Sequence, residues 1–304
     1  MENLQKKAII YVFSGTGNTK RACALYKAEF EKHGVETTLY AIKTGFENLP
    51  NPNEFDFVGF AYPVHAFNAP KIMLQLAKEL PTAVNGDGEK KPYFIVKTSG
   101  EPLQINNMSS SKLKGMLSRK GYRLLSEYHY AMPYNMIFRH TDEMSIKMKN
   151  ALEGLAPIEA REVLNGVSHK LKTVPFAPVL AWIMRIEHPA MQINGRMFKV
   201  DANKCIKCGM CARNCPTNNI TISEDGKFKF GGNCIMCTRC SFKCPTDAFS
   251  IALLNGWRVN GDYTYLPPEK KEKNTHEWYC KRAYKKYFEN AEKKIIENGI
   301  ENDV

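Results

Sequence analysis

Two copies of one cysteine motif constrain this chain more than any other feature of its 304 residues. Residues 205–216 read CIKCGMCARNCP and residues 234–245 read CIMCTRCSFKCP, so each copy has the form C-x2-C-x2-C-x3-C-P. The second copy lies 29 residues after the first at every cysteine, which makes the pair an internal repeat. The chemistry of these eight thiols therefore decides the class of the segment.

The spacing within each copy is typical of [4Fe–4S] ligation. Three thiolates on one tight loop can bind three corners of a cubane, while the fourth cysteine, which precedes proline, points elsewhere. In the bacterial two-cluster pattern that fourth cysteine binds the other cluster. The spacing therefore predicts two clusters with exchanged fourth ligands, one bound by Cys205, Cys208, Cys211 and Cys244 and the other by Cys234, Cys237, Cys240 and Cys215.

Other uses of cysteine fit this pattern less well. Disulfides need an oxidising compartment, and the start MENLQKK leads into a strand-like run without a signal-peptide pattern. Zinc sites favour paired C-x2-C knuckles over four cysteines that end in Cys-Pro. Cys23 and Cys280 stand outside the repeat and are expected to be buried or incidental thiols. The segment from Arg196 to Leu254 resembles the bacterial two-cluster ferredoxins.

A second motif, SGTGNT, follows the apolar run AIIYVF and reads as a phosphate-binding turn between a strand and a helix. It fits neither a Walker loop nor the dinucleotide fingerprint, because Lys20 replaces the third glycine. Hydroxyls, backbone N–H groups and a helix dipole can hold a phosphate monoester without a cation. The residues expected to do so are Ser14, Gly15, Thr16, Gly17, Asn18 and Thr19. This loop resembles the FMN phosphate loop of flavodoxins.

The order of apolar runs extends that resemblance over residues 5–135. Strand-like runs occur at 8–13, 35–42, 55–64, 92–99 and 121–132, and helical stretches such as 17–33, 70–80 and 109–120 separate them. This alternation predicts a doubly wound α/β sheet. The flavodoxin resemblance implies five parallel strands, with FMN bound at their carboxyl ends.

The resemblance also implies that two further loops hold the isoalloxazine ring. YPVHAFNAP follows the third strand, and TSGE follows the fourth, where its backbone could bond the polar edge of the ring. Aromatic side chains of the first loop are expected to stack on the ring or border it, and His65 could donate a proton. The expected ring-binding residues are Tyr62, Pro63, Val64, His65, Phe67, Thr98, Ser99, Gly100 and Glu101.

The chain is therefore expected to combine an α/β part with a small α+β part. We expect a flavodoxin-like domain at 1–139, a helical connector at 140–195, a two-[4Fe–4S] ferredoxin domain at 196–265 and a helical tail at 266–304. The connector should break near Pro157, and it could join the domains, cover the flavin or form a subunit interface. The tail mixes opposite charges and predicts a solvated helix.

The net charge of +12 is concentrated in the middle, where residues 101–200 hold 14 basic and 8 acidic side chains. No nucleic-acid motif accompanies this charge, so we expect an acidic protein or an anionic substrate as partner rather than nucleic acid. The longest apolar stretch falls short of the ~20 residues that span a bilayer. We expect a cytoplasmic protein without a membrane span, and leave open whether it is a homodimer.

The whole chain resembles the fused flavodoxin–ferredoxin proteins of anaerobic bacteria. This resemblance implies an oxidoreductase that passes electrons between two [4Fe–4S] clusters and FMN. The favoured function is an enzyme that reduces an unidentified small organic acceptor, and the alternative is a one-electron carrier that supplies a partner enzyme. The expected donor is a low-potential one, such as a ferredoxin or a ferredoxin-reducing enzyme, because the chain has no nicotinamide-binding fingerprint.

Overall fold

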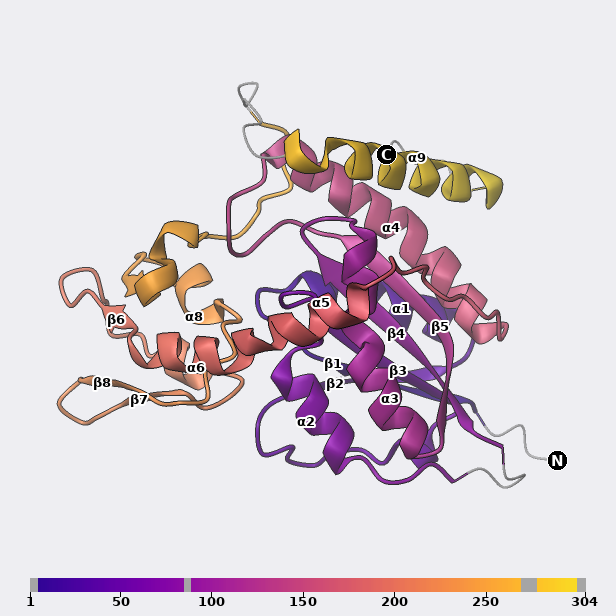
Figure 1. Cartoon of the computed structure of the whole chain (residues 1–304), viewed down its shortest axis with the longest axis horizontal. Helices are drawn as coiled ribbons and strands as arrows, with labels where there is room; N and C mark the ends of the chain where they lie inside the picture. The colour runs from indigo at the N-terminus through magenta and orange to yellow at the C-terminus, as the bar shows by residue number, and fades with distance from the viewer. Residues whose placement is uncertain (1–4, 85–88, 269–277, 300–304) are drawn as a thin grey trace.

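The computed structural model describes residues 5–84, 89–268 and 278–299. Its first half is a five-stranded parallel sheet in the order β2-β1-β3-β4-β5 (Figure 1). This is the order of the flavodoxin-like doubly wound fold, so the predicted fold is confirmed. The elements are β1 (Lys7–Val12), α1 (Asn18–Lys32), β2 (Glu36–Ala41), β3 (Phe57–Pro63), α2 (Lys71–Glu79), β4 (Lys91–Ser99), η2 (Gln104–Ser110), α3 (Ser111–Arg119) and β5 (Tyr122–Ala131).

Helices cover both faces of this sheet, which explains why the sequences of its strands are continuous apolar runs. Successive side chains of a strand point to opposite faces, and β1 illustrates this. Ala8 and Ile10 belong to the core beneath α1, whereas Ile9 and Tyr11 belong to the core beneath α2 and α3. A parallel sheet that is buried on both faces needs apolar residues at every strand position. The sequence therefore identifies the strands without showing which face each side chain takes.

The helix α4 (Asp142–Leu164) lies beside α1 on the same face of the sheet. The expected break near Pro157 is wrong, because α4 continues through this residue. Proline removes one helical hydrogen bond, but Leu152 and Ala156 on the same helix are buried in the core of the sheet. We attribute the uninterrupted helix to this burial.

The helix α9 (Lys281–Glu297) lies over α4, so the end of the chain returns to its first half (Figure 1). The expectation of a solvated helix is wrong for one face of α9. Ala291 and Ile295 are buried in the same core as α1 and α4, and Lys294 Nζ lies 3.2 Å from Glu159 Oε1. The opposite charges noted in the sequence therefore pair in part across two helices.

The remaining elements form the cysteine-rich half and its connection to the sheet. No helix within the described ranges is long and apolar enough to cross a bilayer. The boundaries of the four expected parts stay predictions. The elements are α5 (Ala177–Ile183), η3 (Met184–Ile186), α6 (Glu187–Arg196), β6 (Lys199–Val200), α7 (Met210–Arg213), β7 (Ile220–Ile222), β8 (Phe228–Phe230), α8 (Arg239–Phe242), β9 (Phe249–Ser250) and η4 (Ala252–Trp257).

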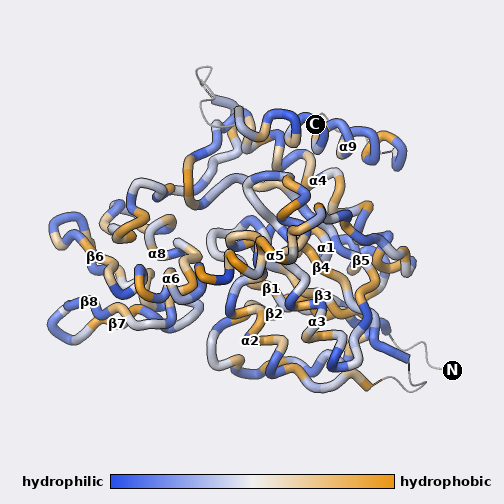
Figure 2. The backbone as a smooth tube through the Cα atoms, in the orientation of Figure 1, coloured by the Kyte–Doolittle hydropathy of each residue, from blue (hydrophilic) through white to orange (hydrophobic). Residues whose placement is uncertain are grey.

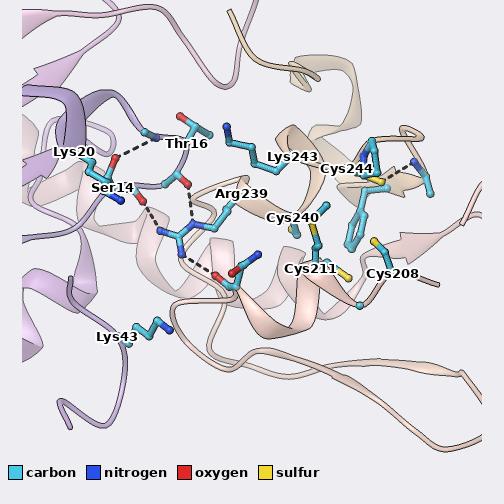
Figure 3. Close-up of a pocket in the computed structure, with 18 of the residues that line it drawn as sticks. Ser14, Thr16, Lys20, Lys43, Cys208, Cys211, Arg239, Cys240, Lys243 and Cys244 are labelled. Atoms are coloured by element: carbon cyan, nitrogen blue, oxygen red, sulfur yellow. Dashed lines mark hydrogen bonds between the residues drawn. The ribbon is translucent and has the colours of Figure 1, made fainter. Parts of the chain in front are cut away.

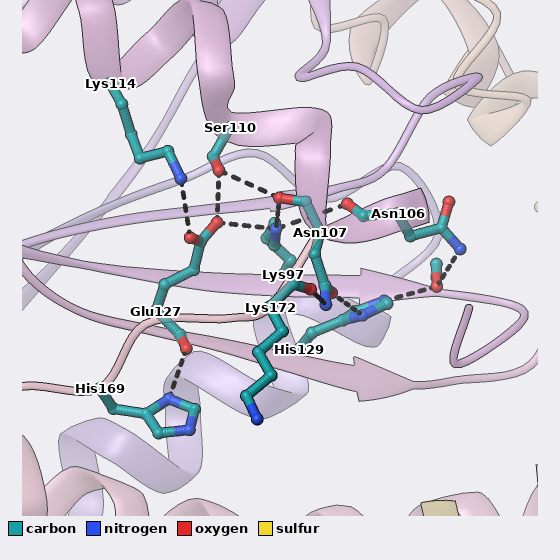
Figure 4. Close-up of polar contacts among 10 residues, drawn as sticks. Lys97, Asn106, Asn107, Ser110, Lys114, Glu127, His129, His169 and Lys172 are labelled. Carbon is teal, nitrogen blue, oxygen red and sulfur yellow. Dashed lines mark hydrogen bonds and ion pairs between the residues drawn. The ribbon is translucent and has the colours of Figure 1, made fainter. Parts of the chain in front are cut away.

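A buried ion pair joins two strands of the sheet (Figure 4). Lys97 of β4 and Glu127 of β5 are 0% and 1% exposed, and Lys97 Nζ lies 2.7 Å from Glu127 Oε1. Lys114 of α3 lies 3.2 Å from the other carboxylate oxygen, and Ser110 donates a hydrogen bond to Glu127. Burial alone would raise the pKa of Glu127, but Lys97 and Lys114 outweigh it and hold that pKa below its ordinary value. The pair therefore ties α3 and the strand edge into one unit.

We expect Glu127→Gln to lower the free energy of unfolding by about 3–5 kcal/mol, because it leaves the Lys97 charge buried without its carboxylate. Urea unfolding followed by circular dichroism measures this loss. The matched control is Glu31→Gln, which removes the exposed Lys27–Glu31 pair at 2.6 Å and should cost about 0–1 kcal/mol. Equal losses in the two variants would contradict a stabilising role for the buried pair.

Candidate cofactor site

The eight cysteines of the repeat surround two separate cavities. A cavity of about 650 Å³ is lined by Cys205, Cys208, Cys211, Cys244 and Cys240. A smaller cavity is lined by Cys215, Cys234, Cys237 and Cys240. Apart from Cys240, which touches both, this is the grouping that exchanged fourth ligands require. Within the described ranges, no three His, Cys, Asp or Glu side chains are grouped as a single metal ion would need.

Residues in the left-handed backbone conformation lie at the turns of the two cysteine loops. Gly209 precedes α7 with φ 69° and Thr238 precedes α8 with φ 54°, and each of these short helices carries the third cysteine of its copy. Backbone N–H groups point at the fourth cysteines, since Asn219 N–H donates to Cys215 Sγ at 3.2 Å and Ala248 N–H donates to Cys244 Sγ at 3.3 Å. Hydrogen bonds to sulfur are among the factors that set a cluster's potential.

Burial affects the thiols of the smaller cavity most strongly. It raises the pKa of Cys234 to about 12, and it raises the pKa of Cys240 well above its ordinary value. Iron binds the thiolate form, so cluster binding must release these protons. Gly195 of α6 packs against Cys234, where an added Cβ would lie 2.1 Å from Cys234 Cβ. A glycine is therefore required at this helix position.

The predicted phosphate loop borders the larger cavity. Ser14, Gly15, Thr16 and Gly17 line it, and Ser14 Oγ accepts a hydrogen bond from Gly17 N–H at 3.2 Å. Helix α1 begins directly after Gly17, whose φ of 122° favours glycine. The other two predicted residues face elsewhere: the Asn18 amide donates to Pro133 O at 2.8 Å, and the hydroxyls of Thr19 and Thr98 lie 2.8 Å apart.

Four cationic side chains that sequence reasoning missed line the same cavity. They come from α1, from the end of β2 and from the second cysteine copy, and they are Lys20, Lys43, Arg239 and Lys243 (Figure 3). No Asp or Glu occurs among the described residues that line it, although Lys243 Nζ lies 2.6 Å from Asp262 Oδ2 at the rim. The loop itself lacks a cation, but the folded chain supplies several around it, which favours an anionic ligand.

Arg239 joins the phosphate loop to the cysteine-rich half (Figure 3). Its guanidinium donates to the carbonyls of Ser14 and Gly15, with Nε 2.8 Å from Gly15 O, and to Asn214 O at 2.7 Å. The only local sequence signal is that Arg239 stands where the first copy has Met210. Nothing in the sequence relates it to a loop more than 220 residues away.

The structure does not bring the expected ring-binding loops to this cavity. Tyr62 is fully buried in the core of the sheet, and Gly100 packs against the ring of Tyr134. Helix α5 covers the loop after β3, where Asn68 Nδ2 donates to Ala181 O at 2.9 Å. As a result, the larger cavity is lined by none of Tyr62, Pro63, Val64, His65, Phe67, Thr98, Ser99, Gly100 and Glu101.

His65 lies in a small cavity with Glu187, His188 and Cys234. Burial, with a smaller effect from the nearby His188, lowers the pKa of His65 to about 4. The imidazole is therefore neutral at pH 7 in this structure. A role for His65 as a proton donor stays a prediction.

Three comparisons with known proteins bear on the two halves. Residues 204–248 match the family described as 4Fe-4S dicluster domain. A stretch of 60 residues is 33% identical to the F(420)H(2) dehydrogenase subunit I of Methanosarcina mazei, and it covers 20% of this chain and 34% of that relative. The chain thus matches about a third of the relative's length.

Solved flavodoxins are similar to the first half at low identity. A WrbA-like flavodoxin from Agrobacterium tumefaciens is 17% identical with a TM-score of 0.36, over 53% of this chain and 96% of that one. The two-electron reduced flavodoxin of Megasphaera elsdenii is 16% identical with a TM-score of 0.31, over 41% and 85%. The fold assignment rests on the strand order. A flavodoxin-like fold joined to a 4Fe-4S segment indicates electron transfer of the oxidoreductase type.

Proposed function

We propose that this chain is an iron–sulfur flavoprotein oxidoreductase that holds two [4Fe–4S] clusters and one FMN. Electrons from a low-potential donor would pass through the clusters to an unidentified organic acceptor. The observation that supports this proposal is the 650 Å³ cavity, which the phosphate loop lines on one side and four cysteines of one cluster line on the other. A cofactor in this cavity would lie next to that cluster.

The cluster would fill the cysteine end of the cavity, and the residues at the other end suit a flavin nucleotide in chemistry. Ligand sites of small molecules are mostly apolar with a few polar groups. Thr16, the N–H groups after Gly17 and Lys20 would hold the phosphate. Leu39, Ile42 and Phe228 provide apolar wall for the ring. Bound FMN supplies the exchange between one-electron and two-electron chemistry.

The proposed ring position differs from the one that the flavodoxin resemblance implies. The loop after β3 is covered by α5 and by the cysteine-rich half. The loop after β4 is covered by Tyr134 and Tyr284, whereas the cavity lies on the β2 side of the phosphate loop. A cavity with walls from both halves favours a reductase over a carrier, which needs an exposed flavin edge. Cys208 is exposed, so a protein donor could approach that cluster from solvent.

An anaerobic reductive titration of the purified holoprotein tests the proposal. We expect an uptake of ~4 electrons per chain, two at FMN and one at each cluster. Absorbance should show bleaching of both chromophores, and iron and flavin analyses fix their occupancy. Markedly fewer electrons at full occupancy would overturn the cofactor assignment. A screen of organic acceptors then separates the two functions, because a carrier would reduce only a partner protein.

A further inference from the structure

An exposed apolar stripe runs along the helical connection between the two halves. Helices α5, η3 and α6 follow one another without a break from Ala177 to Arg196. Phe176 just before this run is 83% exposed, Ile186 is 72% exposed and Trp182 is 67% exposed. We define the apolar stripe as Phe176, Val179, Leu180, Trp182, Ile183, Ile186, Ile193 and Met197.

The spacing of the stripe is that of a helix face which normally packs on a core. Val179, Trp182, Ile183 and Ile186 stand at positions i, i+3, i+4 and i+7, the pattern of an amphipathic helix. In this run the inner face uses small residues, since Ala177 and Ala181 pack against Met108 of η2. The larger apolar face is therefore turned outward, and Figure 2 colours several positions around α5 as hydrophobic.

Basic side chains lie beside the stripe. Arg185 of η3 donates to Asn68 Oδ1 at 3.3 Å, just before α2. Lys71 of α2 lines one small cavity with Glu187 and His188 of α6. Lys78 of α2 and Lys112 of α3 lie on neighbouring helices, and burial, together with the charges of Arg185 and Lys78, lowers the pKa of Lys112. Lys71 and Arg185 act in the same way on His188. We define the basic flank as Lys71, Lys78, Lys112 and Arg185.

Acidic side chains are scarce on the same elements. Across α2, α3, α5, η3 and α6 the sequence has only Glu79 and Glu187, and the side chain of Glu187 is only 10% exposed. Burial raises the pKa of Glu187 to about 7, so its charge is also reduced. The face that carries the stripe is thus strongly positive.

We propose that this face binds the surface of bilayers that contain anionic phospholipids, with the apolar stripe in the interface and the basic flank against the headgroups. Helices with Trp, Phe and aliphatic residues on one side and basic neighbours lie in the plane of such interfaces. Anionic headgroups attract Lys and Arg over a Debye length. The basic flank matches the anionic headgroups, and the outward apolar stripe matches the apolar interior of the interface. The inference does not depend on the proposed function.

Vesicle flotation of the full holoprotein tests this proposal. Phosphatidylcholine vesicles that contain phosphatidylglycerol should bind the wild type, whereas pure phosphatidylcholine vesicles should bind it at least ~10-fold more weakly. Trp182→Ser with Ile186→Ser should weaken binding ~10-fold or more, because both apolar contacts are lost. The matched control is Ile296→Ser on α9, which is 66% exposed in the wild type and should leave binding unchanged. Lys78→Gln with Lys112→Gln should remove the preference for the anionic vesicles.

Three results would overturn the proposal. The first is that the wild type does not bind anionic vesicles. The second is that the Trp182→Ser and Ile186→Ser variant (the stripe variant) binds them as the wild type does while its cluster absorbance is intact. The third is that sedimentation equilibrium shows the wild type as a dimer and the stripe variant as a monomer. That result would assign the stripe to a contact between two copies of the chain. If the stripe variant fails to fold, the Lys78→Gln and Lys112→Gln variant decides, since an unchanged lipid preference refutes the role of the basic flank.

Discussion

Replacing Cys205 and Cys244 together by alanine should remove one cluster and leave the other complete. If these two cysteines bind the same cluster, iron per chain should fall from ~8 to ~4 atoms, because the remaining cluster keeps all four thiolates. Both thiols line the 650 Å³ cavity although they belong to different copies of the repeat. Iron analysis and EPR of the reduced protein measure the loss.

The matched variant keeps Cys205→Ala and replaces Cys215 instead of Cys244. In Cys205→Ala with Cys215→Ala, both changed residues come from the first copy, but each should bind a different cluster. Both clusters then lose one ligand, and neither should retain its native signal. If this second variant keeps one intact cluster and the first does not, each copy binds its own cluster, and the exchanged assignment is wrong.

A single methyl group at Gly15 should separate the phosphate loop from the cysteine-rich half. An alanine Cβ there would lie 2.6 Å from Cys237 O and 3.3 Å from Cys237 Cβ, and backbone cannot move aside as a side chain can. Overpacking of this kind costs about 1–3 kcal/mol. We therefore expect Gly15→Ala to raise the dissociation constant of FMN roughly 10- to 100-fold, measured by quenching of flavin fluorescence in anaerobic protein.

Two glycines elsewhere provide controls for this variant. Gly256→Ala introduces a Cβ with no atom within 4 Å, so it should bind FMN like the wild type. Gly59→Ala forces a Cβ against the ring of Phe94 in the core, so it should lower Tm while the folded protein keeps its flavin affinity. Unchanged FMN binding by Gly15→Ala would show that the cavity between the halves is not the flavin site.

The strands of the sheet could be predicted because each one is marked by its own local run of apolar residues. Each parallel strand is buried on both faces, so runs such as residues 8–13 and 92–99 stand out against the helices between them. The observed β1 and β4 differ from those runs by one residue at most at either end. Helix α4 could not be bounded in the same way. Pro157 signals a break locally, and only the packing of α4 on α1 and α9 overrides it.

Only the local parts of the candidate site could be predicted from the sequence. Cysteine spacing and the glycine-rich loop are local patterns with fixed chemistry. Arg239 contacts the loop, and Lys43 lines the same cavity, only because distant parts of the chain meet there, and periodicity and spacing carry no signal for such contacts. The ring-binding loops were assigned by resemblance to flavodoxins. That resemblance gives no information on which loops the added cysteine-rich half and its connecting helices cover. Asn68 and α5 show that the added half changes which strand ends remain open.

The return of α9 to the first half has a consequence for how the protein is made. The ribosome completes the sheet first and the cysteine-rich segment second, and only then releases the helix that covers α4. The first half therefore lacks part of its outer layer until α9 has been synthesised, and the Lys294–Glu159 ion pair forms only then. No single proteolytic cut or gene truncation can divide the chain into two complete domains. Separate expression of the first half would need α9 supplied in trans or joined to α4 by a new linker.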